Sequence, residues 1–138
     1  MKKLLALTGI VILAFMNAAY SASDDENQER PSLFTVERFV IAGSVDNREP
    51  VGIVNAFSSS TEQVYCFLEA RDISEDTTVN VVWYHSEKEM ARVALLLREG
   101  KRWRTYSSKQ LRGLAGEWKV ELQDAYDTVI ETVTFTVE

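Results

Sequence analysis

The stretch Glu117–Gln123 reads EWKVELQ and alternates polar with apolar residues. Trp118, Val120 and Leu122 would share one side of a strand, because successive strand side chains point to opposite faces. The stretch Thr132–Val137, TVTFTV, repeats the pattern. A period of two predicts strands with one buried face and one face in water.

The rest of the chain after residue 32 carries the same kind of signal. Clusters of turn-forming residues separate short segments that are rich in β-branched and aromatic residues. The further predicted strands are Phe34–Ser44, Val51–Phe57, Gln63–Arg71, Thr78–His85, Met90–Arg98 and Arg102–Ser107. Seven to eight strands at such intervals predict an all-β fold, an antiparallel, immunoglobulin-like β-sandwich. A small barrel is the alternative.

One stretch, Glu87–Leu97, has the composition of a helix, being rich in Glu, Lys, Met, Ala and Leu. Its apolar positions Ala91, Val93 and Leu95 nevertheless follow a period of two, and its flanks read as strands. We therefore predict a strand here too.

The first residues predict export. Lys2 and Lys3 precede the apolar run Leu4–Met16, and small residues follow that run, which is the layout of a secretory signal peptide. We expect a signal peptide over residues 1–21, a disordered acidic lead-in over 22–32, and a β-sandwich domain over 33–138. The run is short for a spanning helix, which needs about 20 apolar residues. The expected location is the periplasm or the outside of the cell, with an uncleaved membrane anchor as the alternative.

Charge and cysteine content narrow the classes of partner. Loss of Lys2 and Lys3 with the signal peptide changes the formal net charge from −6 to −8. Such a chain repels phosphate backbones, so we expect no nucleic-acid partner. Cys66 is the single cysteine, which excludes an internal disulfide. Because Cys66 alternates with Val64 and Leu68, we expect it to be buried, with a reactive or interchain-paired thiol as the alternative.

The register of one hairpin decides which aromatic side chains face the core. A three-residue turn at Ser86–Lys88 would pair Trp83 with Ala91 and Tyr84 with Met90. A two-residue turn would pair Trp83 with Arg92 and Tyr84 with Ala91 and would leave Trp83 exposed, because a slip by one residue reverses every face. We favour the three-residue turn because it places Trp83 in the longer apolar row, and therefore in the core.

Basic and aromatic residues gather on the outer side of the predicted strands. With Trp103 in the core, its neighbours on the same strand project outward, where guanidinium groups can bind carboxylates and stack on aromatic rings. The predicted binding surface consists of Tyr84, Arg92, Arg102, Arg104, Tyr106 and Lys109. Its expected occupant is a cell-envelope partner or an anionic or sugar-containing ligand. The alternative is a solvated strand whose arginines pair with Glu and Asp.

The sequence gives little support for a catalytic site or a metal site. His85 is the only histidine, and Ser107 lacks the strained Gly-x-Ser-x-Gly context of a nucleophile. One histidine and one core-facing cysteine cannot close a four-ligand metal site. We expect no catalytic residue, metal or cofactor. Two alternatives remain: a structural subunit of an envelope assembly, suggested by apolar Met90, Ala94 and Leu96, and a hydrolase that uses His85.

Several short motifs occur together in the second half of the chain. They are WYH at 83–85, ARV at 91–93, RWRTYSSK at 102–109 and GEW at 116–118. In this combination the chain resembles a bacterial family known as domain of unknown function 2914, over Phe34–Val137. The resemblance implies an exported or membrane-associated protein and the extent of the domain, and it implies no chemistry. Ser86–Lys88 lacks the glycine often found in that turn, and Asp124–Asp127 lacks the expected Asp-Gly.

Overall fold

The computed structural model describes residues 31–138, so the predicted signal peptide and nearly all of the predicted lead-in lie outside the described residues. The described part contains β1 (Thr35–Asp46), β2 (Glu49–Ile53), β3 (Ala56–Phe57), β4 (Gln63–Ile73), β5 (Thr77–His85), β6 (Lys88–Leu97), β7 (Gly100–Gln110), β8 (Gly116–Gln123) and β9 (Val129–Val137). The all-β prediction is confirmed, including a strand where the composition suggested a helix.

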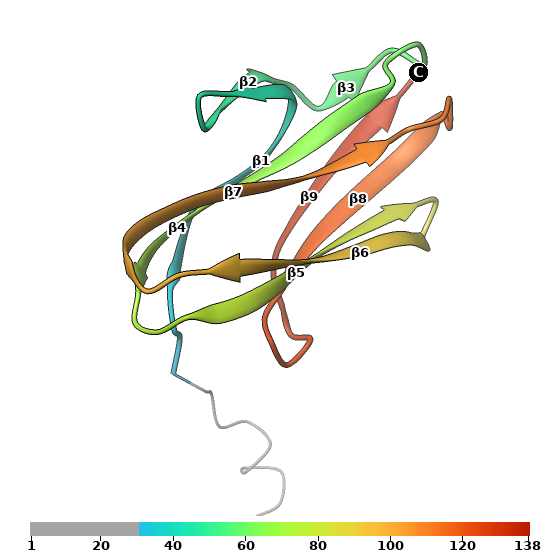
Figure 1. Cartoon of the computed structure of the whole chain (residues 1–138). Coiled ribbons are helices and arrows are strands. Elements are labelled where there is room, and N and C mark those ends of the chain that lie inside the picture. The colour runs from blue at the N-terminus through green and yellow to red at the C-terminus, as the bar shows by residue number, and fades with distance from the viewer. Residues whose placement is uncertain (1–30) are drawn as a thin grey trace, which may run out of the picture. The chain divides into compact units, whose positions relative to one another are not determined.

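The strands form two sheets that face each other (Figure 1). One sheet has four strands in the order β2-β1-β4-β7, and the other has five in the order β3-β9-β8-β5-β6. The chain crosses between the sheets after β2, β3, β4, β6 and β7. This arrangement is an immunoglobulin-like sandwich, in which β5, β8 and β9 take the places of strands C, F and G.

Two details of the predicted sheet are wrong. The predicted strand Val51–Phe57 divides into β2 and β3, so the described residues hold nine strands rather than seven or eight. Gly52 has a φ of 73°, a backbone conformation that is easiest for glycine, near the end of β2. After the crossing, β3 runs parallel to β9, which breaks the all-antiparallel pattern.

The core lies between the two sheets and is built on aromatic rings. Trp118 stacks on Phe135 with ring centroids 5.7 Å apart, and Trp83 meets Phe135 edge to face. Trp83 is fully buried, as predicted. Cys66 is also fully buried, and burial raises the pKa of its thiol. The expectation that Cys66 is buried is therefore confirmed.

The turn between β5 and β6 has two residues, not three. Ser86 and Glu87 have φ values of 49° and 69°, which is the left-handed conformation of a type I′ hairpin turn. The residues that flank this turn, His85 and Lys88, pair directly.

An extra residue in β6 then restores the favoured register. Tyr84 pairs with Glu89, whereas Trp83 pairs with Ala91, so Met90 forms a β-bulge. The predicted pairing of Trp83 is confirmed, and the predicted pairing of Tyr84 with Met90 is wrong. Met90 does not lie beside Tyr84 on the outer face; it packs against the core.

The turn gives a first testable prediction. The double change Ser86→Asn with Glu87→Gly should raise the free energy of unfolding by about 1–2 kcal/mol, because these residues adopt the left-handed conformation with less strain. Thermal unfolding followed by circular dichroism measures the effect. The control Lys88→Gly, one residue further along, should instead destabilise the strand. An equal gain from Lys88→Gly would contradict the two-residue turn.

Candidate functional site

The predicted binding surface does not form one continuous surface. Arg102, Arg104 and Tyr106 project from β7 on the outer face of the four-stranded sheet, whereas Tyr84 and Arg92 lie on the outer face of the five-stranded sheet. The prediction assumed that these strands adjoin. They do not, because the chain crosses to the other sheet between β6 and β7.

Lys109 is not part of the predicted surface either, for a different reason. It pairs with the core residue Val64 across β4 and β7, and paired residues share a face. Its side chain is therefore on the inner side of β7, opposite to Arg104, and its Nζ donates to the carbonyl oxygen of Gln110 at 3.1 Å. The alternation along β7 already separates Lys109 from the outward-facing arginines.

A buried glutamate organises the outer face of the four-stranded sheet. Glu69 is 2% exposed and accepts hydrogen bonds from Arg38 at 2.7 Å, from Arg102 at 2.5 Å and from Arg71 at 3.3 Å. Three guanidinium groups from three neighbouring strands thus meet one carboxylate. A buried charge needs such partners, because an unpaired one is expensive to remove from water.

A second glutamate reaches the same face from the β1–β2 hairpin. Glu49 accepts from Arg38 at 3.0 and 3.2 Å and from Arg104 at 2.6 Å, and Arg102 lies 3.8 Å away. Its side chain is 45% exposed. We call Arg38, Arg71, Arg102 and Arg104, with the two glutamates that join them, the arginine surface. Ion pairing of the predicted arginines with Glu, which was the alternative interpretation, is therefore present.

The arginines keep both glutamates ionised. Burial alone would raise the pKa of Glu69, but hydrogen bonds and charge from Arg38 and Arg102 outweigh burial and place the pKa below its usual value. Hydrogen bonds from Arg38 lower the pKa of Glu49, with a smaller contribution from Arg104. Both carboxylates are thus bound in the charged form at neutral pH.

Aromatic rings support this surface. The guanidinium of Arg38 lies 4.9 Å from the ring centre of Phe67, which is fully buried on the outer side of β4. Tyr106 packs against Tyr65 with ring centroids 5.6 Å apart and remains 47% exposed. The expected outward position of Tyr106 is confirmed.

Sequence reasoning missed the two glutamates and Arg38. One signal was available, because Glu69 is a charged residue in the otherwise apolar run CFLEA at 66–70, and such a residue requires a partner when the strand is buried. Glu49 gave no signal, since it follows a turn and reads as an ordinary polar hairpin residue.

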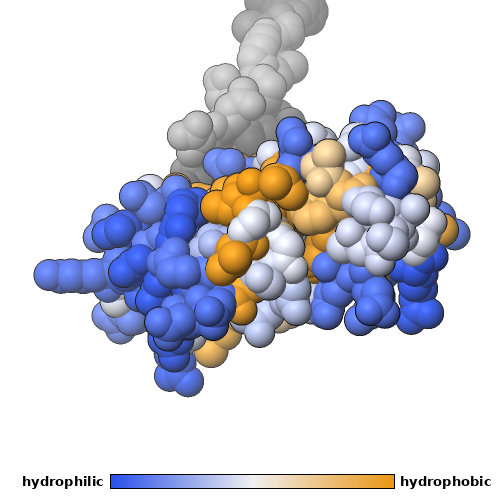
Figure 2. Space-filling view, turned by 90° about the horizontal axis from the view of Figure 1, so that it is seen from above, coloured by the Kyte–Doolittle hydropathy of each residue, from blue (hydrophilic) through white to orange (hydrophobic). Residues whose placement is uncertain are grey.

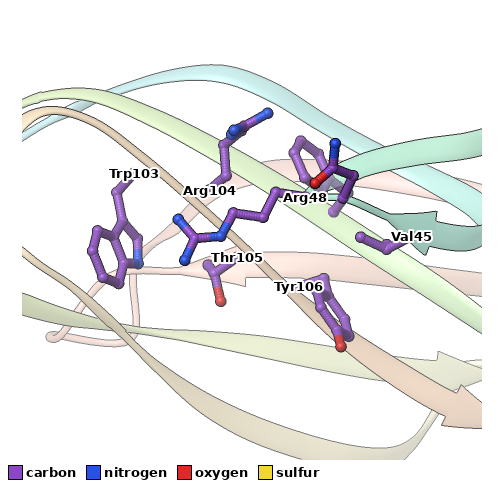
Figure 3. Close-up of a pocket in the computed structure, with 8 residues that line it drawn as sticks. Val45, Arg48, Trp103, Arg104, Thr105 and Tyr106 are labelled. Carbon is purple, nitrogen blue, oxygen red and sulfur yellow. The ribbon is translucent and has the colours of Figure 1, made fainter.

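A pocket opens between the tip of the β1–β2 hairpin and the edge strand β7 (Figure 3). Its volume is about 360 Å³, and no Asp or Glu lines it. The lining residues are Val45, Asn47, Arg48, Phe67, Trp103, Arg104, Thr105 and Tyr106. Two arginines and three aromatic residues thus meet in one hollow, and two of the predicted surface residues, Arg104 and Tyr106, take part.

The outer face of the five-stranded sheet has its own series of side-chain hydrogen bonds. Tyr84 donates to Glu121 at 3.2 Å, Gln123 donates to Glu121 at 3.0 Å, and Arg92 donates to Gln123 at 2.9 Å. Burial, followed by the charge of Glu121, raises the pKa of Tyr84. Arg92 also pairs with Glu89 at 3.1 Å. Glu89, the amide oxygen of Gln123 and, at 3.8 Å, Asp127 thus satisfy Arg92.

The residues considered for hydrolysis have other partners. Trp83 Nε1 donates to Ser107 Oγ at 3.0 Å in the core, and His85 Nε2 lies 2.7 Å from the carbonyl oxygen of Ala115. Within residues 31–138, no group of three His, Cys, Asp or Glu side chains is placed to hold a metal ion. The same residues contain no helix that is both long and apolar enough to span a membrane.

The family described as "Protein of unknown function (DUF2914)" matches residues 76–137. The match covers β5 to β9, which include Tyr84, Arg92, Arg102, Arg104 and Tyr106, and it confirms the resemblance seen in the sequence. The DUF2914 match does not extend to β1–β4, which supply Glu49 and Glu69. No curated protein matches the chain.

Among solved structures, the chain is similar to parts of several β-glucosidases. The Listeria innocua enzyme in complex with glucose is 9% identical with a TM-score of 0.47, over 75% of this chain and 15% of that chain. The Kluyveromyces marxianus enzyme in complex with glucose is 12% identical with a TM-score of 0.45, over 76% and 14%. An enzyme of saponin metabolism from intestinal bacteria is 13% identical with a TM-score of 0.49, over 76% and 16%. This chain spans less than a fifth of the length of each enzyme, and similarities at this level do not indicate a function.

Proposed function

We propose that this DUF2914 protein is an exported, non-enzymatic binding module that holds an acidic cell-envelope partner on its arginine surface. The observation that carries the proposal is the excess of guanidinium groups there: four arginines meet the two bridging glutamates and, 3.8 Å from Arg71, Glu37. The chain as a whole has a net charge of −6, so a locally positive face is unusual for it. Export is part of the proposal and rests on the N-terminal pattern.

The arginine surface is prepared for a carboxylate-bearing partner. Glu69 and Glu49 hold the guanidinium groups in place, which reduces the entropy that a partner must remove on binding. Arg71 and Arg102 still have side-chain exposures of 43% and 44%. Arg71 and Arg102 also lie 3.8 Å from Glu37 and Glu49, respectively. Each guanidinium has five N–H donors, so the donors that these glutamates and Glu69 do not use remain available to a partner's carboxylate.

Binding to polyglutamate tests the proposal. The double variant Arg71→Gln with Arg102→Gln should bind immobilised polyglutamate about tenfold more weakly, since losing about 1.4 kcal/mol changes affinity tenfold. Charge reversal is avoided, because a new glutamate beside Glu69 would destabilise the fold. The matched control is Arg92→Gln, which removes a paired, exposed arginine from the other sheet. Equal weakening by Arg92→Gln, or no weakening by the double variant, would contradict the proposal.

A second candidate function, as a structural subunit, has one observation in its favour. Val51, Ile53 and Val54, at and just after the edge strand β2, are 49%, 54% and 49% exposed. Figure 2 shows an apolar patch between two hydrophilic regions at the end of the molecule where β2 and β3 lie. Of the residues that first suggested this function, Leu96 is 45% exposed and Met90 packs against the core.

Light scattering tests whether the protein is a structural subunit that assembles with copies of itself. A subunit that assembles through β2 should form dimers or larger species at high concentration, and Ile53→Lys should reverse this. A strict monomer would remove self-assembly as the role of the patch. A hydrolase that uses His85 gains no support from the contacts of that residue and is not proposed.

A further inference from the structure

The charged groups that line the pocket beside β7 are both guanidinium groups, those of Arg48 and Arg104. The guanidinium of Arg48 extends from the hairpin across the pocket toward Trp103 and Thr105 (Figure 3). Among residues 31–138, the side chain of Arg48 forms no hydrogen bond or ion pair, whereas the neighbouring Arg104 is held by Glu49 at 2.6 Å. The pocket therefore contains one uncompensated positive charge.

The indole nitrogen of Trp103 is a second unused donor. The other two tryptophans donate within the protein, Trp83 Nε1 to Ser107 Oγ and Trp118 Nε1 to the carbonyl oxygen of Leu114, both at 3.0 Å. Trp103 Nε1 is buried and has no partner in the described part of the chain. Its ring nitrogen is turned toward the guanidinium of Arg48 (Figure 3). Buried donors without an acceptor are rare, and each calls for an explanation.

The walls of the pocket add an apolar and aromatic surface. The ring of Phe67 and the side chain of Val45 line it, and the ring of Tyr106 stands at 47% exposure beside them. A volume of about 360 Å³ is at the lower end of small-ligand pockets, which run from roughly 300 to 1,000 Å³. The space suits a single ring with a small substituent, not a polymer.

We propose that this pocket binds a small ring-bearing monocarboxylate, whose carboxylate pairs with Arg48 and accepts a hydrogen bond from Trp103 Nε1. The ring lies against Val45 and Tyr106. A carboxylate fits better than a phosphate because one unpaired guanidinium balances one negative charge and its fork matches two carboxylate oxygens. This site goes beyond the proposed function and does not depend on it, since neither Arg48 nor Trp103 belongs to the arginine surface.

The three indole N–H signals of the full chain provide the test. In ¹H–¹⁵N correlation spectra, galacturonate or benzoate at millimolar concentration should shift one indole signal, and Trp103→Phe should remove that signal from the spectrum. The signals of Trp83 and Trp118, whose N–H groups are already bonded, should stay in place. The two probes distinguish a sugar acid from an aromatic acid as the better representative of the class. Galactose and benzyl alcohol, which lack the carboxylate, should produce no shift.

Substitution of the guanidinium completes the experiment. Arg48→Gln should weaken binding of the effective probe at least tenfold while leaving the Trp83 and Trp118 signals unchanged, which shows that the fold is intact. Arg112→Gln is the matched control, because Arg112 is also exposed with a positive φ, 52° against 63° for Arg48, and lies outside the pocket. Its binding should match the unaltered chain. Any one of three results would overturn the proposal. The Trp103 signal does not shift, it shifts equally with galactose or benzyl alcohol, or it shifts with inorganic phosphate alone. Polyglutamate binding should survive Arg48→Gln, so failure of this site and failure of the arginine surface are distinguishable.

Discussion

Replacing Glu69 with glutamine is expected to lower the free energy of unfolding by about 3 kcal/mol. The change removes the negative charge that three arginines share, Arg38, Arg71 and Arg102, and leaves their guanidinium groups close together. Glutamine keeps the shape of the side chain and is no larger, so the loss reports charge and not packing. Urea unfolding followed by tryptophan fluorescence measures the change through the midpoint at constant slope.

The matched control is the same substitution at the other glutamate of the surface. Glu49→Gln should lower the free energy of unfolding by no more than about 1 kcal/mol, because a side chain that is 45% exposed exchanges its ion pairs for water. Equal losses at Glu49 and Glu69 would show that burial does not set the strength of this network.

The pH dependence follows from the lowered pKa of Glu69. A carboxyl whose pKa is lower in the folded state than in the unfolded state stabilises the protein above the unfolded value, about 4.3 for Glu. That contribution is lost as the pH falls through the folded value. The difference in stability between the unaltered chain and Glu69→Gln should therefore be constant from pH 7 to about pH 5 and shrink below about pH 4.

Replacing Trp83 with alanine should lower the free energy of unfolding by about 4 kcal/mol. Trp83 is 0% exposed, meets Phe135 and donates to Ser107, so alanine leaves a large cavity and an unpaired buried hydroxyl. Urea unfolding again measures the loss.

Trp103→Ala is the control for Trp83→Ala, because Trp103 is only half-buried at the edge strand β7 and its Nε1 has no partner to lose within residues 31–138. Its loss should be about half as large. A larger loss at Trp103 would contradict the position of the core between the sheets.

The sequence was sufficient to predict which side of a regular strand such as β8 is buried. Alternation along β8, with Trp118, Val120 and Leu122 inward, required only the period of two, and all three are buried. The same rule placed Arg104 outward, whereas the inward position of Trp83 also required a choice of hairpin register. Such predictions succeed because the direction of a side chain depends on neighbours one or two residues away.

Which strands lie side by side could not be predicted in the same way. Tyr84 and Arg104 are close in the sequence, yet they face outward from different sheets, because the β6–β7 connection crosses the sandwich. Conversely, Arg104 donates a hydrogen bond to Glu49 at 2.6 Å, although the two residues are 55 positions apart in the sequence. Both facts depend on the order of strands in the sheets, which alternation leaves open. The bulge at Met90 is a further case, since one inserted residue changes the register without changing the composition.

The decisive measurement is a map of backbone amide shifts in the full chain on addition of polyglutamate. If the arginine surface is the binding face, the largest shifts should lie on β4 and β7, around Glu69, Arg102 and Arg104, and should fade with added salt. Shifts centred on Tyr84 and Arg92 of the other sheet, or none at all at low salt, would contradict the claim that the outer face of the four-stranded sheet is the functional one.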